Sequence, residues 1–513
     1  MKRFFKWAAI VVSALILLLI LVIGSFIGWL KWSGERDWKR AEAELRAKGE
    51  KLTFAELVPP MPPDSENFFA DPLWAEYADL VQRKNVQGLD EWVPRLRSDQ
   101  YQLQRWQYSL LAPEEKERLI KLIPSVKGIN NRKEAFSLLR AKLDQEKDLQ
   151  KQREMAALLL DVVAPADPVL IHVAKLSERP KAQFPIRYDL GPRTPLPQIS
   201  AIMSLAQIIN RKALSELILG KIKEAATDTQ TLLRLSSIVK NDPMLISFLV
   251  RVSSVTLALQ PINEGILRHS WTAADLNSFQ ERLNRLHLQE GILTALKGER
   301  AFFNQCDSAL IGAELTCSSS RSNLLEKMEV KLNQLCFQSI FIKDKAFQNL
   351  WFQRNVETLN SNISTGWNAT SAQSADQEIT ALAKNPLNRI IYALNVISSS
   401  AIASCCLKAV ECQTQADQTL IACALERYRL ARGSYPSSLE ALVPEYLAKL
   451  PNSPITGKPM NYSPKPDGTF LLWSPGWNLK SLGGKPGEFL GEGDIVWGQP
   501  LPKLSREKPK ASE

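Results

Sequence analysis

The sequence predicts a mainly α protein with a single N-terminal transmembrane helix, an array-like multi-helix body and a small C-terminal α+β module with an antiparallel hairpin. Three observations predict this: an uncharged stretch at residues 7–30, helical periodicity from residue 70 to about 430, and a rise in Gly and Pro content after Gly433. A charged fraction of 23% and a hydrophobic fraction of 45% exclude a disordered or collagen-like chain. We expect five segments: a signal anchor (1–32), a juxtamembrane helix with a proline-rich strap (33–69), a helical domain (70–411), an α+β module (412–500) and a disordered tail (501–513).

The uncharged stretch is long enough to cross a lipid bilayer. As a helix, residues 7–30 span about 36 Å, compared with about 30 Å for the hydrocarbon core. Trp7 and Trp29 stand near its two ends, where aromatic rings favour the headgroup region. A cleaved signal peptide is the alternative, but its apolar region is only about 7–15 residues long. We therefore expect residues 7–30 to contact the bilayer as a single-pass signal anchor of the inner (cytoplasmic) membrane.

The orientation of this anchor does not follow from the basic residues, because they flank it on both sides. A short N-terminal tail followed by one anchor and a large domain favours an extracytoplasmic (periplasmic) body. A second apolar stretch, residues 390–407, contains Asn395 and four serines, which weaken lipid insertion. We expect it to form a buried core helix.

The segment after the anchor has two parts. Residues 33–52 are rich in Ala, Glu, Arg and Lys, which predicts a solvated helix that ends near Gly49. Four prolines follow between Pro59 and Pro63, and prolines remove backbone donors and favour extended backbone. This composition indicates either a stiff linker or a strap that lies over a domain.

The body shows clear helical signals. Apolar residues repeat at three- and four-residue spacing behind a capping box formed by Thr272 and Asp275. Three further helices are expected between residues 197 and 260, separated by Gly220 and by the sequence at 241–243. The hairpin around Gly220 is similar to a tetratricopeptide unit, with Ala225 at a close helix contact, but no 34-residue recurrence exists, so a generic helical array is predicted. The periodic residues are Leu276, Phe279, Leu283 and Leu286.

The composition of the last 81 residues predicts a small β structure. They hold 10 of the 23 Gly and 12 of the 30 Pro. Three short aromatic and β-branched runs, NYSPK, TFLLWSP and DIVWG, predict strands, and the turn at residues 466–468 joins the first two. A helix that carries Leu425 and Tyr428 on one face should stop at Gly433, and Ser437 or Ser438 should cap a short helix that ends before Pro444.

Residues 424–478 resemble the C-terminal globular part of the type II secretion major pseudopilin. The shared order is a helix that ends in Tyr-Arg and Gly-x-Tyr-Pro, then Leu-Pro and Pro-x-x-Gly-x-Pro, then a hairpin with a Ser-x-Gly turn. The resemblance implies a pseudopilin-like α+β fold. The matching residues are Tyr428, Arg429, Gly433, Tyr435, Pro436, Leu450, Pro451, Pro454, Gly457, Pro459, Asp467, Gly468, Ser474 and Gly476.

Two departures limit what this resemblance implies. The anchor lacks the prepilin peptidase site and early Glu of that family, so the chain is not expected to assemble as a pilin subunit. The family also binds calcium in the loop after this hairpin. Here that loop offers only Glu488, Glu492 and Asp494 as carboxylates, opposed by Lys480 and Lys485, whereas calcium takes about 6–8 oxygen ligands. We expect a glycine-rich structural loop and no metal site.

The whole layout also looks like large uncharacterised membrane-anchored proteins of Planctomycetes and Verrucomicrobia. These proteins combine an anchor, a proline strap, a helical middle and a pseudopilin-like end, and the resemblance implies no reaction. The matching strap residues are Pro59, Pro60, Pro62, Pro63, Asp64, Asn67 and Phe68.

The seven cysteines show no metal-binding or redox spacing, because no C-x-x-C occurs. Cys405, Cys412 and Cys423 share one helix face but lie about 10 and 16 Å apart along the axis, too far for disulfides, so buried small side chains are expected. The best disulfide candidate is Cys306 with Cys317.

No catalytic, cofactor-binding or metal-binding residue is predicted. The sequence lacks H-E-x-x-H, G-x-S-x-G, Walker A and G-x-G-x-x-G motifs. The histidines at 172, 269 and 287 stand singly, and His287 is expected as a structural residue on the amphipathic helix. The sequence therefore favours a membrane-anchored binding or scaffold protein of the cell envelope over an enzyme. An envelope hydrolase or other enzyme, with an unrecognised site in the helical body, is the alternative.

The net charge of +10 does not indicate a nucleic-acid partner. Much of the excess lies around the anchor and in the tail, and no basic stripe stands out elsewhere. We expect the bilayer and envelope proteins as partners, and no nucleic acid.

Overall fold

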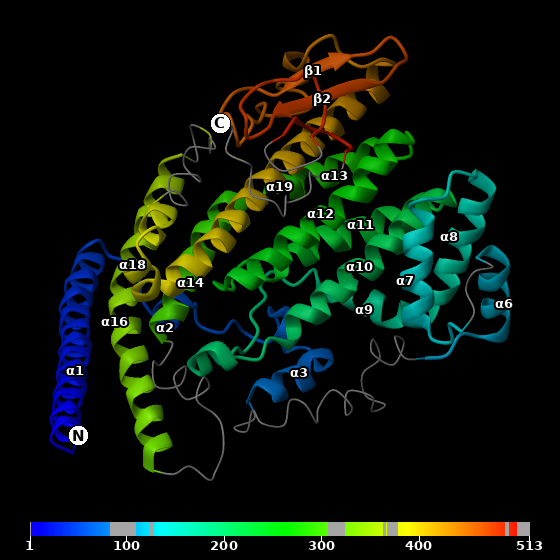
Figure 1. Cartoon of the computed structure of the whole chain (residues 1–513). Coiled ribbons are helices and arrows are strands. Elements are labelled where there is room, and N and C mark those ends of the chain that lie inside the picture. The colour runs from blue at the N-terminus through cyan, green and yellow to red at the C-terminus, as the bar shows by residue number, and fades with distance from the viewer. Residues whose placement is uncertain are drawn as a thin grey trace.

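The computed structural model describes residues 2–82, 109–123, 128–305, 324–362, 366, 378–487 and 492–499. It consists mainly of α-helices, with one small antiparallel sheet near the C-terminus (Figure 1). Both features confirm this part of the predicted fold class. The α-helices are α1 (Lys2–Ala47), α2 (Phe54–Leu57), α3 (Pro72–Gln82), α6 (Pro113–Leu122), α7 (Arg132–Leu143), α8 (Leu149–Val163), α9 (Asp167–Leu176), α10 (Pro197–Ile218), α11 (Ile222–Ile238), α12 (Leu245–Leu267), α13 (Ala273–Leu283), α14 (Leu288–Gln305), α16 (Leu324–Ser361), α18 (Pro386–Ile391) and α19 (Ala393–Arg432). The 3-10 helices are η1 (Phe68–Ala70), η3 (Ala164–Ala166), η4 (Tyr188–Arg193) and η5 (Leu439–Leu442), and the strands are β1 (Asn461–Pro464), β2 (Phe470–Pro475) and β3 (Asp494–Val496).

Helix α1 joins the uncharged stretch and the charged segment after it in one helix of 46 residues. It ends where Gly49 adopts a φ of 75°, a conformation that costs glycine little. The apolar side chains from Leu15 to Val22 are each more than half exposed, whereas Leu30 and Leu45 are buried. The expectation of a solvated helix after the anchor is therefore only partly right, because one face of that part packs on the body.

Three described helical segments are long and apolar enough to cross a membrane, where the sequence pattern predicts one. They are Ile10–Ala47, Leu149–Leu176 and Leu245–Leu267, and in their most apolar windows 0%, 50% and 67% of the residues are buried. The stretch at residues 390–407 is half-buried rather than a fully buried core helix. Its Ile402 is buried, but Ile397 is 73% exposed.

Helix α16 lies beside α1 at one edge of the molecule (Figure 1). A Cβ atom added at Gly34 would lie 2.9 Å from the backbone nitrogen of Lys343, so glycine permits the close approach of the two helices. An ion pair between Asp37 and Lys343 holds the same contact. The ammonium group of Lys345 lies 4.3 Å from the centre of the Trp38 ring.

We expect Gly34→Ala to loosen the packing of α1 on α16. The added methyl group meets backbone, and overpacking of this kind costs roughly 1–3 kcal/mol, which offsets the gain in helix propensity of about 1 kcal/mol. The control is Gly28→Ala, because nothing lies within 4 Å of a Cβ atom at Gly28. Urea unfolding of the detergent-solubilised full chain, followed by tryptophan fluorescence, measures both variants. Equal stability of the two variants would contradict the close contact.

The segment that follows the four prolines lies against the body. The Asn67 side chain makes two hydrogen bonds to the backbone of Gln183. Its Nδ2 donates to the backbone carbonyl at 2.9 Å, and its Oδ1 accepts from the backbone N–H at 2.9 Å. Behind it, Phe68 and Phe69 are buried against Trp74, with ring centres 5.2 and 5.1 Å away. The aromatic cluster fastens the strap by burial of apolar surface.

A buried arginine connects the end of α1 to the body. Arg300 on α14 is 0% exposed, and its guanidinium donates to Glu50 Oε2 at 2.7 Å, to the carbonyl of Lys51 at 3.0 Å and to Gln353 Oε1 at 2.6 Å. Such charge-assisted bonds are shorter and stronger than neutral ones. A buried polar cluster therefore ties the segment that follows α1 to the body.

The three helices expected between residues 197 and 260 are α10, α11 and α12. The turn between α10 and α11 contains Gly220 at a φ of 77°, and Ala225 is fully buried. Helix α13 begins at the predicted capping box, in which the Asp275 amide donates to Thr272 Oγ1 at 3.2 Å. The helix ends at Leu283, so the placement of His287 on it is wrong.

The C-terminal sheet lies across one end of α19 (Figure 1). Its order is β1-β2-β3, and both pairs are antiparallel, with Tyr462 opposite Leu472 and Trp473 opposite Val496. These are the three predicted strands. Along β2, Phe470, Leu472 and Ser474 are buried while the residues between them are half-buried.

Helix α19 packs against both the helical body and the C-terminal sheet. It contacts α12, α13 and α14, and its C-terminal part contacts β2, β3 and η5. The predicted boundary between residues 411 and 412 falls inside this helix, which ends at Gly433 with a φ of 84°, as expected. Ser438 stands at the N-cap position of η5, but its side chain makes no capping bond to the backbone.

The cysteines that the structure describes have free thiols. Those at 405, 406, 412 and 423 are buried, which confirms the prediction for Cys405, Cys412 and Cys423. The proposed pair Cys306–Cys317 and the tail 501–513 lie outside the described residues.

Candidate functional site

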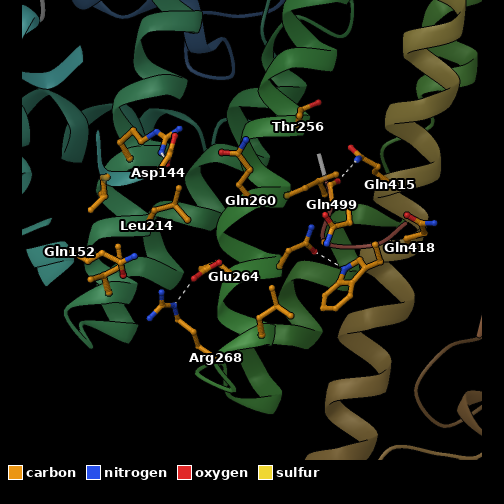
Figure 2. A pocket seen from close by; sticks show the side chains of 18 residues that line it. Asp144, Gln152, Leu214, Thr256, Gln260, Glu264, Arg268, Gln415, Gln418 and Gln499 are labelled. Carbon is orange, nitrogen blue, oxygen red and sulfur yellow. Dashed lines mark hydrogen bonds and ion pairs between the residues drawn. The ribbon is translucent and has the colours of Figure 1, made fainter. Parts of the chain in front are cut away.

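An open groove lies between α7, α8, α10, α12, α19 and the turn after β3. Its volume is about 520 Å³, within the range of about 300–1,000 Å³ that is usual for ligand sites. Figure 2 shows side chains from α12 and α19 that line it. The lining residues are Leu143, Asp144, Gln152, Arg211, Leu214, Ile218, Thr256, Leu259, Gln260, Asn263, Glu264, Leu267, Arg268, Gln415, Gln418, Trp497, Gly498 and Gln499.

Two pairs of amide side chains provide hydrogen-bonding groups in the groove. Gln260 and Asn263 stand three residues apart on α12, and Gln415 and Gln418 stand three residues apart on α19. Residues at this spacing share one face of a helix. The two helices pack against each other, so the sequence brings two amide pairs into one groove.

On α12, the carbonyl oxygens of the two amides are already occupied. Asn263 Oδ1 accepts from Thr419 Oγ1 at 3.0 Å and from Trp497 Nε1 at 2.8 Å. Gln260 Oε1 accepts from Asn210 Nδ2 at 3.2 Å. The network assigns the amide orientations, and it leaves the NH₂ groups of Gln260 and Asn263 as the available donors.

On α19, the opposite atoms are occupied. Gln415 Nε2 donates to the carbonyl of Gln499 at 3.2 Å, and Gln418 Nε2 donates to the carbonyl of Ile495 at 2.7 Å. This leaves the Oε1 atom of the half-buried Gln415 as an acceptor. Gln418 is 0% exposed, and its Oε1 has no hydrogen-bond partner among the described residues.

The charged side chains of the groove are paired. Arg211 donates to Asp144, and Arg268 Nε donates to Glu264 Oε1 at 2.6 Å. The formal charges of the lining residues therefore sum to zero. This balance favours a neutral ligand over an anion or a cation.

The lining residues offer hydrogen bonding but little catalytic chemistry. None of the eighteen described lining residues is Ser, Cys, His, Lys or Tyr, so these eighteen include neither a serine or cysteine nucleophile nor an imidazole base. Its one hydroxyl, that of Thr256, donates to the carbonyl of Val252 at 3.0 Å and contacts the Cys412 thiol at 3.6 Å. The arrangement suits recognition of a polar group.

A separate cluster of titratable groups lies between α10 and α11. Lys212 Nζ donates to Glu216 Oε1 and to Asp228 Oδ2, both at 2.9 Å. Burial, and then the neighbouring charge of Asp228, raise the pKa of Glu216 to about 8. Burial also raises the pKa of Asp228. Like charges at close range disfavour ionisation of both carboxyls, so the pair holds a proton near neutral pH. These three residues do not line the groove.

Two carboxyls on α19 also have raised pKa values. Burial raises the pKa of Glu411 to about 7, and Glu411 Oε1 accepts from Trp477 Nε1 at 2.9 Å. Burial raises the pKa of Asp417 to about 7 as well, and its carboxylate accepts from Gln413 Nε2 at 2.9 Å. Each carboxyl has a structural amide or indole partner.

The three histidines are dispersed, as their sequence positions suggest. His172 Nε2 lies 3.0 Å from Asp71 Oδ1, and His269 Nδ1 lies 2.9 Å from Glu426 Oε1. His287 is exposed in the turn between α13 and α14, at a φ of 38°.

The loop between β2 and β3 is held by hydrogen bonds from its backbone to Asp494. Asp494 Oδ2 accepts from the amide of Leu482 at 2.9 Å and from that of Gly484 at 2.8 Å. Glu488 lies outside the described residues, and Glu492 is exposed. No group of three or more His, Cys, Asp and Glu suited to a metal ion occurs in the described part of the chain.

Sequence reasoning missed the groove and a buried cluster around Glu426. Glu426 is 0% exposed and accepts from Arg429 Nη2 at 2.7 Å, from Tyr435 Oη at 2.6 Å and from His269. The sequence signal for the groove was two pairs of amide residues, each at helical spacing. These pairs indicate a site only once it is known that α12 and α19 pack together.

No family model, no curated protein and no solved structure matches this chain.

Proposed function

We propose that this chain is a single-pass membrane-anchored binding protein of the cell envelope, with its body on the extracytoplasmic side of the inner membrane. Residues 7–30 are the anchor and the groove is the binding site. The observation that carries the proposal is a 520 Å³ groove of zero net charge, lined by amides with unused hydrogen-bonding atoms, in a chain whose first helix exposes its apolar side chains.

Burial supports α1 as the one segment that enters the bilayer. The apolar window of α1 is 0% buried, whereas half or more of the other two windows is buried within the structure. Insertion of either of those would require the body to unpack, at a cost of about 25 cal/mol for each Å² of apolar surface that leaves the core. Helix α1 needs no such change.

We also propose that residues 412–500 form a pseudopilin-like module. The support is the order of elements after Gly433: η5, then a hairpin of β1 and β2, then a loop that leads to β3. Two residues of the sequence motif, Tyr435 and Ser474, contact other residues of this segment. Tyr435 lies edge-on to Phe470 at 4.9 Å, and Ser453 Oγ hydrogen-bonds Ser474 Oγ at 2.7 Å.

An envelope enzyme is the second candidate. The carboxyl pair of Glu216 and Asp228 favours it, because a shared proton beside Lys212 could serve acid–base chemistry. However, the pair does not line the 520 Å³ groove, so a substrate bound there would not reach it. The binding role is therefore better supported.

The orientation is tested by protease treatment of intact spheroplasts that carry the full chain. We expect the body to be cleaved from outside while the anchor fragment stays with the membrane. Full protection of the C-terminus until the membrane is lysed would contradict an extracytoplasmic body.

The binding role is tested by a photo-crosslinking amino acid placed at Gln499, which lines the groove and is exposed. The matched control is Gln230 on α11, a half-buried glutamine outside the groove. We expect crosslinked products in membranes from position 499 and not from position 230. The same products from both positions, or none from 499, would contradict a ligand in the groove.

A further inference from the structure

We propose that Lys212, Glu216 and Asp228 form a proton-dependent latch between α10 and α11. The latch holds the two helices together while its two carboxyls share one proton, and it loosens when alkaline pH removes that proton. This pH response of the fold does not depend on the groove being a binding site.

Three carboxyl groups from three helices surround one ammonium group. Lys212 Nζ on α10 lies 2.9 Å from Glu216 Oε1, one turn further along the same helix, and 2.9 Å from Asp228 Oδ2 on α11. Asp167, the first residue of α9, has its Oδ1 3.9 Å from the same nitrogen. If every group were ionised, three negative charges would face one positive charge. Such an excess of like charge is costly where little water can screen it.

The burial of Glu216 favours a proton on the pair. The Glu216 side chain is 4% exposed and that of Asp228 is 15% exposed. Glu216 Oε2 is buried without a hydrogen-bond partner among the described residues. Ionised carboxylates only accept hydrogen bonds, so two of them cannot bond to each other, whereas a protonated carboxyl can donate to an ionised one. A proton on Glu216 therefore provides a hydrogen bond to Asp228 that the fully ionised pair lacks.

The electrostatic surroundings agree with this placement of the proton. Burial, and then the charge of Asp228, raise the pKa of Glu216 to about 8, although Lys212 acts in the opposite direction. Burial also raises the pKa of Asp228, but the charge of Lys212 and the hydrogen bonds from Lys212 and Glu216 oppose this rise. The pair therefore keeps one proton at neutral pH, with Glu216 as the donor and Asp228 as the acceptor.

The charges that face the latch all come from α9, α10 and α11. Helices α8, α12 and α13 also pack against α10 or α11. Within the described part of the chain, none of these three helices forms an ion pair with Lys212, Glu216 or Asp228. Asp167 is the one further charge that acts on Asp228, and it raises the pKa of that carboxyl after the larger effects of burial, Lys212 and Glu216.

The shared proton links the stability of the α10–α11 hairpin to pH. The folded-state pKa of Glu216 is raised above its ordinary 4.5, so the closed hairpin binds this proton more tightly than an opened one. The stabilisation is fully present below pH 4.5 and is lost as the pH rises to about 8. Across that interval, one proton changes the opening equilibrium by up to about tenfold for each pH unit. Because α10 also lines the groove with Leu214 and Ile218, opening of the hairpin alters one wall of the groove.

The test is amide hydrogen exchange of the full chain in nanodiscs at pH 6 and pH 8, corrected for the intrinsic exchange rate at each pH. We expect the protection of α10 and α11 in the parent to fall by up to about 100-fold, tenfold for each of two pH units. In Glu216→Gln, a neutral amide replaces the protonated carboxyl, so protection should be nearly independent of pH. The matched control is Glu224→Gln on α11, where the carboxylate is exposed, and it should keep the pH dependence of the parent.

Asp228→Asn gives an independent check, because it removes the acceptor of the shared proton while Glu216 stays in place. It should also flatten the pH dependence of protection in α10 and α11. If one of the two variants does not fold, the other decides the result.

Three results would overturn the proposal. Unchanged protection of α10 and α11 in the parent between pH 6 and pH 8 would mean that no proton holds the hairpin. A Glu216→Gln variant that keeps the pH dependence of the parent would mean that Glu216 does not bind the proton. Failure of both Glu216→Gln and Asp228→Asn to fold, while Glu224→Gln folds, would mean that the cluster requires ionised carboxylates.

Discussion

Glu426→Gln is expected to destabilise the full chain by about 2–4 kcal/mol, near the lower part of the range for breaking a buried charged pair. The carboxylate is 0% exposed and accepts from Arg429, Tyr435 and His269. These three partners come from α19, from the segment after Gly433 and from the turn between α12 and α13. The substitution therefore loosens the contact between body and module. Urea unfolding of the solubilised full chain gives the free energy of unfolding.

The contribution of Glu426 to the free energy of unfolding depends on pH. Burial opposes its ionisation, but the hydrogen bonds from Arg429, Tyr435 and His269 outweigh burial and hold the pKa of Glu426 below its ordinary 4.5. A lowered pKa means that the folded state releases this proton more readily than the unfolded state. The stabilisation is therefore complete above pH 4.5 and is lost as the pH falls through the lower, folded-state pKa.

The control for this prediction is Tyr435→Phe, which removes one hydrogen bond and keeps the ring against Phe470. We expect a loss of about 1 kcal/mol. The gap in stability between parent and Glu426→Gln should narrow in acid. A gap that stays constant from pH 7 down to pH 3 would show that the charge of Glu426 does not hold the module.

Gly298→Ala is expected to lower the stability by about 3 kcal/mol or more, or to prevent accumulation of the folded chain. A Cβ atom at this position of α14 would lie 1.7 Å from the carbonyl oxygen of Pro243 and 2.5 Å from its carbonyl carbon. These are backbone atoms at the start of α12, so they cannot rotate away. Helix α14 would have to shift relative to α12.

The control for Gly298 stands on the same helix. At Gly291 an added Cβ atom would meet the end of the Arg251 side chain at 2.7 Å and the Phe248 ring at 2.9 Å. Side chains can move at lower cost than backbone, so Gly291→Ala should cost less. Thermal unfolding and yield of the purified chain rank the two variants, and an equal or larger loss for Gly291→Ala would contradict the backbone contact.

The predictions that held depend on local physics. The uncharged stretch, the capping box at Thr272, the glycine turns at Gly220 and Gly433 and the three short strands follow from side-chain periodicity and backbone preference within a few residues. Local reasoning failed for His287, because α13 ended one turn earlier than the apolar spacing suggested. It also missed the buried face of α1, because Gly34 reads as an ordinary helix residue without knowledge of α16.

The sequence by itself determined that the chain is helical, carries an apolar N-terminal helix and ends in a small sheet. Only the tertiary structure decided which polar residues work together. Gln260 and Gln415 are separated by more than 150 residues, and the Glu426 cluster joins His269 to Tyr435 over a similar distance. The physical reason is that helix formation depends on neighbours along the chain, whereas a polar site depends on which helix faces pack together and which amide atoms that packing has already satisfied.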